Sequence, residues 1–288
     1  MPSRNLLTRR RFSLMAASAA LAPAEPTESL PADRVEKFLS EAKVVSSKPL
    51  SVGITGTRRL TLSDGKLTHD AHFQSIDESK TSFKSPRGSE FGFRDTYKFN
   101  IAGYRLDRIL GIHMVPPSIE RSQGGITGSF TWWIPAALME VDRMKRKIEP
   151  PDVHHYNQQI FVLRVFDELI YNADRNLQNQ LLTPDYKVWM IDHTRGFRLH
   201  HDLKSVKDLD KCDRRLLAAL RKLDKAALKS PLENCLRAIE IDAILRRRDK
   251  IVAAFEKRIS QMGESQVLFD LPPRPAAYPV AYAVNPWR

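Results

Sequence analysis

The alternation of hydrophobic and polar positions divides the chain into a strand-rich part followed by a helix-rich part. The helical spacing of Val35, Phe38 and Leu39 predicts a leading helix, which follows a Pro-, Glu-, Thr- and Ser-rich linker. Short apolar runs bounded by turn residues predict an antiparallel sheet; they cover residues 50–54, 59–62, 71–76, 114–119 and 127–134. A polar loop is expected over residues 77–94, and Asp95 is expected to cap a helix that ends near residue 110.

Beyond residue 135 the pattern is mainly helical. Pro150-Pro151-Asp152 marks the start of a helix whose apolar positions share one face. Other expected elements are a helix over residues 136–147, a hairpin over residues 180–191, helices over residues 214–223 and 232–262, and a loose tail after Leu271.

These elements predict an α+β fold with two lobes, in which a small antiparallel sheet with one helix lies beside a mainly helical lobe. The expected divisions are a signal segment (residues 1–24), a linker and leading helix (25–43), an N-lobe (44–134), a C-lobe (135–271) and a loose tail (272–288).

Composition narrows the class of protein without giving a function. The chain has 288 residues, of which 42% are hydrophobic and 28% are charged, which is the balance of a globular protein that buries a core. No run reaches the roughly 18 apolar residues that a membrane span needs. Cys212 and Cys235 lack the paired spacing of a zinc site, although they could form one disulfide.

The first 24 residues have the layout of a twin-arginine (Tat) export signal. Arg9, Arg10 and Arg11 precede a weakly apolar run over residues 14–22, and small residues follow. The formal net charge is +12, and the four arginines of this segment account for part of it, which leaves +8 beyond. A genuine signal predicts a periplasmic or extracellular protein; a basic tail or a misassigned start is the alternative, and the protein would then be cytoplasmic.

The segment after the helix that starts at Asp152 carries the candidate chemistry. Asp174 and Asn179 lie five residues apart in a polar loop, and Asp192 follows the last strand of the expected hairpin. This order is typical of phosphotransfer from ATP, in which one Asp orients the acceptor hydroxyl while an Asn and a second Asp supply hard oxygen ligands to a divalent metal. Arg175 could neutralise phosphate charge or the loop itself. Asp and Asn are common loop residues, so the pair alone indicates little; the whole order of elements favours phosphotransfer.

Two further motifs resemble a known family. Leu106-Asp107-Arg108-Ile109-Leu110-Gly111 and Val115-Pro116-Pro117 resemble a helix and a strand of the Golgi casein kinase family of secretory-pathway kinases. Residues 172–179 and 191–197 resemble that family's catalytic and metal loops, and more loosely those of HipA-type and type II phosphatidylinositol 4-kinases.

The resemblance spans residues 58–200. It implies an atypical protein-kinase-like fold, and together with the twin-arginine segment it predicts a bacterial exported member of this superfamily. It further implies that Asp174 is the catalytic Asp, that Asp192 binds metal, and that Asn179 is the second metal ligand.

The same resemblance exposes two departures. Gln74 stands where the family has its nucleotide-binding Lys, and Asn100 stands where the helix Glu partner is expected. These amides could hydrogen-bond each other and contact phosphates, but neither supplies positive charge. A lysine from another position could replace it, the candidates being Lys66, Lys80, Lys84 and Lys98.

The sequence therefore predicts an ATP-dependent phosphotransferase that uses Mg²⁺ or Mn²⁺ and acts on a protein, sugar or lipid hydroxyl as a monomer. A pseudokinase that acts as a binding or regulatory protein stays open, because both usual charges are replaced. Binding to nucleic acid is the third and least favoured hypothesis, since only the net charge suggests it.

Overall fold

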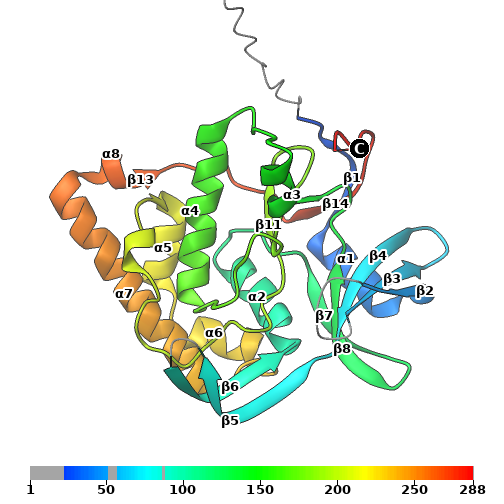
Figure 1. The fold of residues 1–288 in the computed structure, drawn as a ribbon, viewed down its shortest axis with the longest axis horizontal. Helices are drawn as coiled ribbons and strands as arrows, with labels where there is room; N and C mark the ends of the chain where they lie inside the picture. The colour runs from blue at the N-terminus through cyan, green and yellow to red at the C-terminus, as the bar shows by residue number, and fades with distance from the viewer. Residues whose placement is uncertain (1–22, 51–56, 86–87, 288) are drawn as a thin grey trace, which may run out of the picture.

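The computed structural model describes residues 23–50, 57–85 and 88–287. Most of the predicted export signal (residues 1–22 of 1–24) and most of the predicted strand over residues 50–54 lie outside these ranges. Over the described residues the fold is α+β, with a small antiparallel sheet on one side and most of the helices on the other, as Figure 1 shows and as the sequence predicts.

A five-stranded antiparallel sheet of order β2-β3-β4-β8-β7 forms the core of the amino-terminal lobe. Its strands are β2 (Lys43–Pro49), β3 (Arg58–Ser63), β4 (Thr68–Gln74), β7 (Ser118–Gln123) and β8 (Ile126–Trp132). Gly124 and Gly125 have φ values of 58° and 79°, which explains why glycines make the predicted turn between β7 and β8.

The two faces of this sheet differ in character because successive side chains of a strand point to opposite sides. On one face, α1 (Ala32–Glu41) packs against the buried residues of β8, where Phe38 contacts Trp132 edge to face with ring centroids 5.8 Å apart. On the other face lie Asp70, His72 and Gln74 of β4. This second face is therefore polar, and it is the face that meets α2 and the loops of the helical lobe.

Residues 77–94 form a ribbon rather than the predicted loop. Strands β5 (Asp77–Ser85) and β6 (Gly88–Thr96) pair antiparallel, and Phe83 stacks on Phe93 with ring centroids 4.1 Å apart. Such cross-strand aromatic pairs stabilise strands that are otherwise polar. Helix α2 (Lys98–Ile109) follows, and the prediction that Asp95 caps it is wrong, because its carboxylate instead accepts a hydrogen bond from Arg195 Nε at 2.7 Å.

The second lobe is mainly helical, as predicted, and α4 runs through its centre. In α4 (Val153–Leu169) the carboxylate of Asp152 accepts a hydrogen bond from His155 N at 2.8 Å, which confirms the predicted start. The expected hairpin is β10 (Gln180–Leu182) and β11 (Val188–Met190), with β9 (Leu138–Met139) beside β10. The remaining elements are α3 (Glu140–Lys145), the 3₁₀ turn Val206–Asp208, β12 (Cys212–Asp213), α5 (Arg214–Lys222), α6 (Lys225–Leu232), α7 (Ala238–Met262), α8 (Glu264–Val267) and β13 (Leu268–Phe269).

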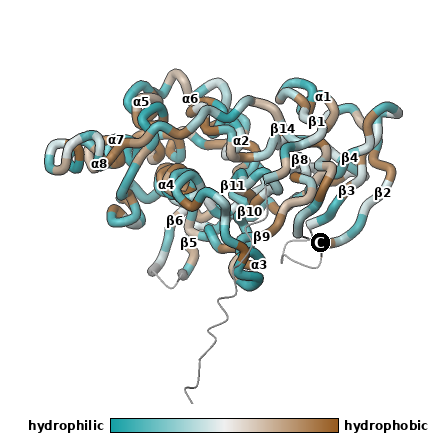
Figure 2. Tube along the Cα trace, turned by 90° about the horizontal axis from the view of Figure 1, so that it is seen from above, coloured by the Kyte–Doolittle hydropathy of each residue, from teal (hydrophilic) through white to brown (hydrophobic). Residues whose placement is uncertain are grey.

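Figure 2 shows α4 to α7 grouped on one side of the molecule and β2, β3, β4 and β8 on the other. Hydrophobic and hydrophilic segments alternate along both groups, so each lobe contributes one side of its elements to the buried core. No helix among the described residues is long and apolar enough to cross a membrane. Cys212 and Cys235 are both buried and are not joined in a disulfide.

The carboxy-terminal tail is ordered against the fold, in contrast to the loose tail that the sequence predicts. Strand β14 (Ala277–Tyr282) pairs antiparallel with β1 (Pro26–Pro31), so the two ends of the described chain lie together (Figure 1). Tyr278 is fully buried, and Trp132 Nε1 donates a hydrogen bond to the carbonyl of Pro279 at 2.9 Å. The tail thus covers the α1 side of the sheet.

Candidate functional site

Arg175 organises the loop that follows α4. Its guanidinium donates to the Asp167 carboxylate, with Nε 2.9 Å from Oδ2 and Nη2 3.1 Å from Oδ1. Nη1 donates to the carbonyls of Asn179 at 2.6 Å and Ile191 at 2.7 Å. Only 7% of the side chain is exposed. Of the two roles considered for Arg175, these contacts match neutralisation and fixing of the loop rather than a contact to phosphate.

His193 connects this loop to the one that carries Asp192. Burial and the adjacent Arg175 charge lower the pKa of His193 well below its usual value, so the ring is neutral and Nε2 accepts a hydrogen bond from Arg175 Nη2 at 3.1 Å. The ring also lies against α2 at Gly103, where a Cβ atom would come 3.1 Å from the ring's Cγ. A glycine at this position therefore allows the close approach of α2 and the Asp192 loop.

The structure brings Asp174, Asn179 and Asp192 to the same place, where the two loops meet. Asn179 Nδ2 donates to the carbonyl of Asp174 at 3.2 Å, and Asp174 N donates to Asn172 Oδ1 at 3.1 Å. Asp192 has a φ of 55°, a left-handed conformation that Asp adopts more readily than most residues, and its Oδ1 accepts a hydrogen bond from Thr194 Oγ1 at 3.2 Å.

Negative charge accumulates at this junction. Partial burial raises the pKa of Asp174; the Arg195 charge opposes the rise, whereas Asp192 and Asp95 add to it. His72, on the polar face of β4, feels the Asp192 charge as well, which opposes the lowering of its pKa by burial. The carboxylates of Asp174 and Asp192 and the imidazole of His72 are therefore close enough for their charges to interact.

The side-chain oxygens of Asn179 and Asp192 fit a divalent cation such as Mg²⁺ or Mn²⁺, because both metals prefer carboxylate and amide oxygens. Among the described residues, no group of three or more His, Cys, Asp and Glu side chains is placed to hold a metal ion. One of the two candidate ligands is the amide of Asn179, and a metal in a phosphotransfer site is normally also bound by water and by phosphate oxygens.

Gln74 and Asn100 are buried, with 2% and 5% of their surface exposed. Asn100 Nδ2 donates to Gln74 Oε1 at 2.8 Å, as the sequence suggests, and Asn100 Oδ1 accepts a hydrogen bond from His193 N at 2.8 Å. The pair therefore links β4 and α2 to the Asp192 loop. The candidate replacement lysines lie elsewhere: Lys66 is in the β3–β4 turn, and Lys80 pairs with Glu78 at 3.2 Å.

Sequence reasoning missed Arg195 and Asp95. Arg195 Nε donates to Asp95 Oδ2 at 2.7 Å, and its Nη1 lies 3.6 Å from Asp174 Oδ2. The only signal in the sequence was the position of Arg195 three residues after Asp192; its partners depend on how β6 packs beside the loop.

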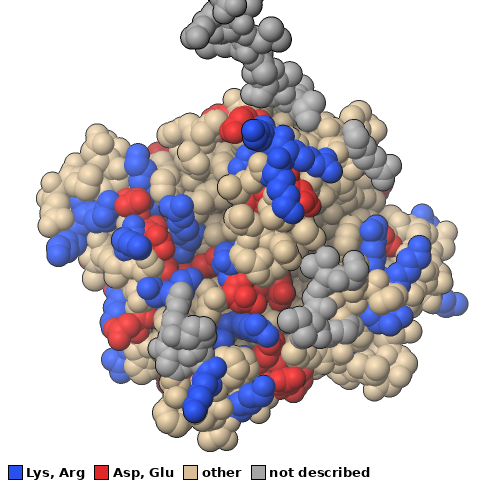
Figure 3. Space-filling model, in the orientation of Figure 1, with Lys and Arg blue, Asp and Glu red and all other residues tan. Residues whose placement is uncertain are grey.

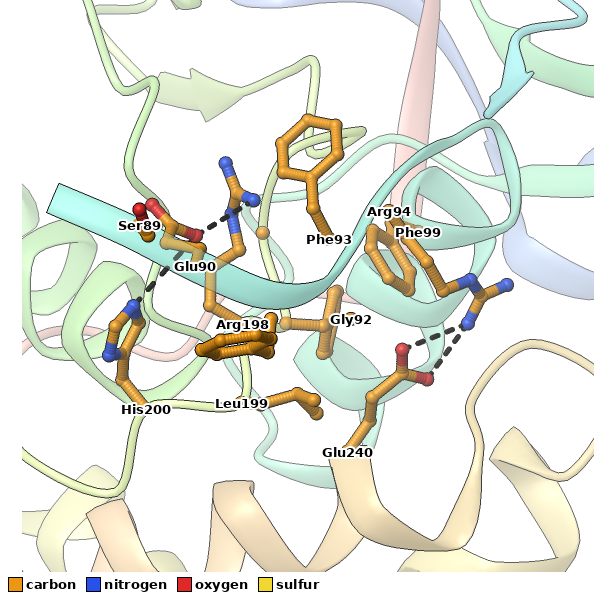
Figure 4. Close-up of a pocket in the computed structure, with 13 residues that line it drawn as sticks. Ser89, Glu90, Gly92, Phe93, Arg94, Phe99, Arg198, Leu199, His200 and Glu240 are labelled. Atoms are coloured by element: carbon orange, nitrogen blue, oxygen red, sulfur yellow. Dashed lines mark hydrogen bonds and ion pairs between the residues drawn. The ribbon is translucent and has the colours of Figure 1, made fainter. Parts of the chain in front are cut away.

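A cavity of about 250 Å³ lies between β6 and residues 196–200 (Figure 4). Its apolar lining includes Phe93, Phe99 and Leu199, and two ion pairs flank it: Glu90 with Arg198 at 3.0 Å and Arg94 with Glu240 at 2.8 Å. Arg94 and Gly196 of its wall directly adjoin Asp95 and Arg195 in the chain, and Arg195 Nη1 lies 3.6 Å from Asp174 Oδ2. At this size it accommodates one side chain or ring, but not a nucleotide.

Comparisons with known proteins find a likeness only at the level of structure. No family model matches the chain, and no curated protein sequence matches it. A structure of hydra Fam20 with sugar superposes with a TM-score of 0.62 at 16% sequence identity, over 83% of this chain and 92% of that one. A Golgi casein kinase superposes with a TM-score of 0.57 at 16% identity, over 86% of this chain and 79% of that one.

A Golgi casein kinase structure with Mn/ADP bound superposes with a TM-score of 0.56 at 16% identity, over 86% of this chain and 79% of that one. At this identity the likeness establishes the fold and leaves the activity to the site's own residues. The chain has the two-lobed α+β fold of these atypical kinases, as the sequence motifs predict.

Proposed function

We propose that the protein is an ATP-dependent phosphotransferase that uses Mg²⁺ or Mn²⁺ and transfers a phosphoryl group to a hydroxyl acceptor. The observation that carries this proposal is the junction of Asp174, Asn179 and Asp192, held together by the buried guanidinium of Arg175. Burying a charged arginine and the carboxylate that it pairs with costs desolvation free energy. Such an arrangement is expected where the loops that it joins need a defined geometry. The Mn/ADP-bound structural neighbour is consistent with this choice of cofactors.

Each residue has a distinct task in this proposal. Asn179 Oδ1 and the Asp192 carboxylate would hold the divalent cation, whose positive charge neutralises the phosphates of ATP. The oxygen of the acceptor hydroxyl bonds to the terminal phosphorus of ATP, and ADP leaves. Asp174 accepts the proton that this hydroxyl loses. Arg175 and Asn100 act by position, since they fix the two loops that carry these ligands.

The cavity of Figure 4 is the site at which we place the acceptor. Gly196 of its wall directly follows Arg195, whose Nη1 lies 3.6 Å from Asp174 Oδ2, so an acceptor held there would extend its hydroxyl toward Asp174. Protein, sugar and lipid acceptors all remain candidates, because the lining combines aromatic rings with ion pairs.

Two observations favour a pseudokinase as the second candidate. Gln74 and Asn100 replace the charged pair that normally contacts phosphate, and both are buried. In addition, the sheet face above the junction is polar: Arg59 Nε donates to Asp70 Oδ2 at 2.7 Å, and Thr61 Oγ1 donates to Asp70 Oδ1 at 2.7 Å. An adenine base normally packs between apolar groups, so this face is unusual for tight nucleotide binding.

The test is ATP turnover and autophosphorylation by the full chain with Mn²⁺ or Mg²⁺, beside Asp192→Ala and Asp174→Asn. A phosphotransferase should lose turnover in both variants, by about 100-fold or more. Metal-dependent stabilisation by ATP without any transfer would support the pseudokinase. Neither turnover nor nucleotide binding in the folded wild type would contradict the proposal.

We also propose that the protein is exported, and the twin-arginine segment is the only feature that supports this. Its test is cell fractionation of the full chain beside Arg9→Lys/Arg10→Lys/Arg11→Lys, which should retain the protein in the cytoplasm if the signal is genuine. Nucleic acid remains the least favoured partner: on the face shown in Figure 3, Lys and Arg are interspersed with Asp and Glu rather than gathered in one uninterrupted patch.

A further inference from the structure

We infer that Arg195 contacts the phosphoryl group that is transferred, and so supplies the positive charge that Gln74 and Asn100 lack. This inference rests on the proposed function. Arg195 is not among the metal-binding and catalytic residues expected from the sequence. The inference follows from its ion pairs at the junction of the two loops.

The guanidinium of Arg195 is anchored on one side and open on the other. Nε donates to Asp95 Oδ2 at 2.7 Å, and the Asp95 side chain is only 4% exposed. Among the described residues, neither Nη1 nor Nη2 makes a hydrogen bond, and 42% of the side chain is exposed. The two terminal nitrogens are therefore available as donors to a ligand while the anchor limits their movement.

The open side of the guanidinium faces the reacting position. Nη1 lies 3.6 Å from Asp174 Oδ2, which is an ion-pair distance longer than a hydrogen bond. The charges of Asp174 and Asp192 both act on Arg195, together with that of Asp95. A phosphoryl group passing from ATP to a hydroxyl at Asp174 would lie within reach of these two nitrogens, which can bind two of its oxygens at once.

The neighbouring cations already have partners. Arg175 uses its guanidinium on Asp167 and on carbonyl oxygens. Arg59 pairs with Asp70 at 2.5 Å, and the buried Arg198 pairs with Glu90 at 3.0 Å. Of these arginines, Arg195 alone combines exposure with a place beside Asp174.

In the transfer step, the acceptor oxygen bonds to the terminal phosphorus, the bond from phosphorus to the bridging oxygen breaks, and the proton passes to Asp174. Arg195 forms and breaks no covalent bond. It donates hydrogen bonds to the oxygens of the moving group, whose charge is the target of preorganised cations in phosphoryl transfer. ATP carries this group and ADP does not, so binding of the two nucleotides should respond differently to a change at Arg195.

The test is calorimetric binding of the β,γ-imido analogue of ATP and of ADP, each with Mn²⁺, to the full-length wild type and to Arg195→Gln. We expect Arg195→Gln to weaken binding of the analogue by about 10-fold to 100-fold and to change binding of ADP by less than about threefold. Arg214→Gln is the matched control, because Arg214 is 45% exposed and pairs with Glu264 on the far helical side; it should change neither.

The variant leaves the buried Asp95 without its partner, so Asp95→Asn/Arg195→Gln is measured beside it. Equal affinity of wild type and both variants for the ATP analogue overturns the inference. So does increased phosphate transfer in Arg195→Gln, because Arg195 would then be a restraint on Asp174. Partial recovery of transfer in Arg195→Gln on addition of guanidinium chloride at non-denaturing concentration supports it. A folded wild type that binds neither nucleotide contradicts the proposed function itself, and the inference with it.

Discussion

Asn100 Oδ1 accepts a hydrogen bond from the backbone N–H of His193 at 2.8 Å. This contact joins α2 to the residue directly after Asp192, and the same amide also donates to Gln74 on β4 at 2.8 Å. A neutral amide thereby does by hydrogen bonding what a charged pair would do by attraction: it couples the sheet, the helix and the loop that carries Asp192. Gln74 and Asn100 thus make this connection without any formal charge.

Asn100→Ala should therefore loosen the Asp192 loop. His193 N and Gln74 Oε1 lose a partner in a buried position, which costs about 1–3 kcal/mol in the free energy of unfolding. We also expect weaker binding of Mn²⁺ with nucleotide, since Asp192 is less well positioned. Urea unfolding and calorimetry would measure both, with the exposed Asn234→Ala as control; unchanged stability and binding in Asn100→Ala would contradict the coupling.

Arg175→Lys should fail to replace arginine although the charge is kept. A compact ammonium cannot reach the Asp167 carboxylate, two carbonyls and the His193 ring together. We expect a loss of about 2 kcal/mol in the free energy of unfolding and loss of ATP turnover. Arg214→Lys, at an exposed ion pair, should cost less than about 1 kcal/mol. Equal effects at the two positions would show that Arg175 has no special role in the loop.

Elements whose cause is local were predictable from the sequence. The start of α4 follows from Asp152, whose side chain accepts a hydrogen bond from the otherwise unpaired N–H of His155 in the first turn. The β7–β8 turn follows from two glycines with positive φ. The proximity of Asp174 and Asn179 is also local, because both belong to one short loop closed by their own hydrogen bond.

Elements whose cause is tertiary were not predictable. The ribbon of β5 and β6 is polar in sequence, and it depends on contacts such as that of Arg94 with Glu240, which lie far apart in the chain. The pairing of Arg195 with Asp95 joins residues separated by 100 positions. A single sequence carries no signal for such pairs, because the charged residues of any loop have many possible partners.

The stability of the protein should depend on the protonation of Asp107. This residue of the Leu106-Asp107-Arg108 motif is fully buried, and burial raises its pKa from 3.8 to about 7 although Met114 N donates to Oδ1 at 2.9 Å. Between about pH 4 and 7 the folded chain keeps the proton and the unfolded chain releases it. The free energy of unfolding therefore falls as pH rises, by about 1.4 kcal/mol per pH unit at most, and levels off above pH 7.

Asp107→Asn removes this titration, so the stability of the variant relative to wild type should rise between pH 5 and 7 and then stay constant. Urea unfolding at pH 5, 6, 7 and 8 measures the difference. Asp249→Asn, where the side chain is 65% exposed, should follow the wild type throughout. Parallel curves for Asp107→Asn and wild type would mean that Asp107 is already ionised in the folded protein at pH 5.

Filling the cavity of Figure 4 should separate acceptor use from nucleotide use. Leu199→Trp places a larger ring in the cavity, beside Gly92. Transfer of phosphate to a library of serine-containing peptides should fall about tenfold or more. Hydrolysis of ATP, in which water is the acceptor, should be retained. Val206→Trp, at a 57% exposed position outside the cavity, is the control. A parallel fall in both reactions would place the acceptor elsewhere.

The ordered tail should contribute directly to the stability of the sheet. Tyr278 is fully buried, and its ring lies edge-on to Tyr104 of α2 with centroids 6.4 Å apart. Tyr278→Ala removes this packing and leaves a cavity, so we expect a loss of about 3–5 kcal/mol in the free energy of unfolding. Val284→Ala, at a 59% exposed position in the same tail, should change stability by less than about 0.5 kcal/mol. Urea unfolding of both variants decides the question: equal and small effects would mean that the tail lies loosely on the protein in solution, whereas a large effect confined to Tyr278 shows that β14 belongs to the folded core.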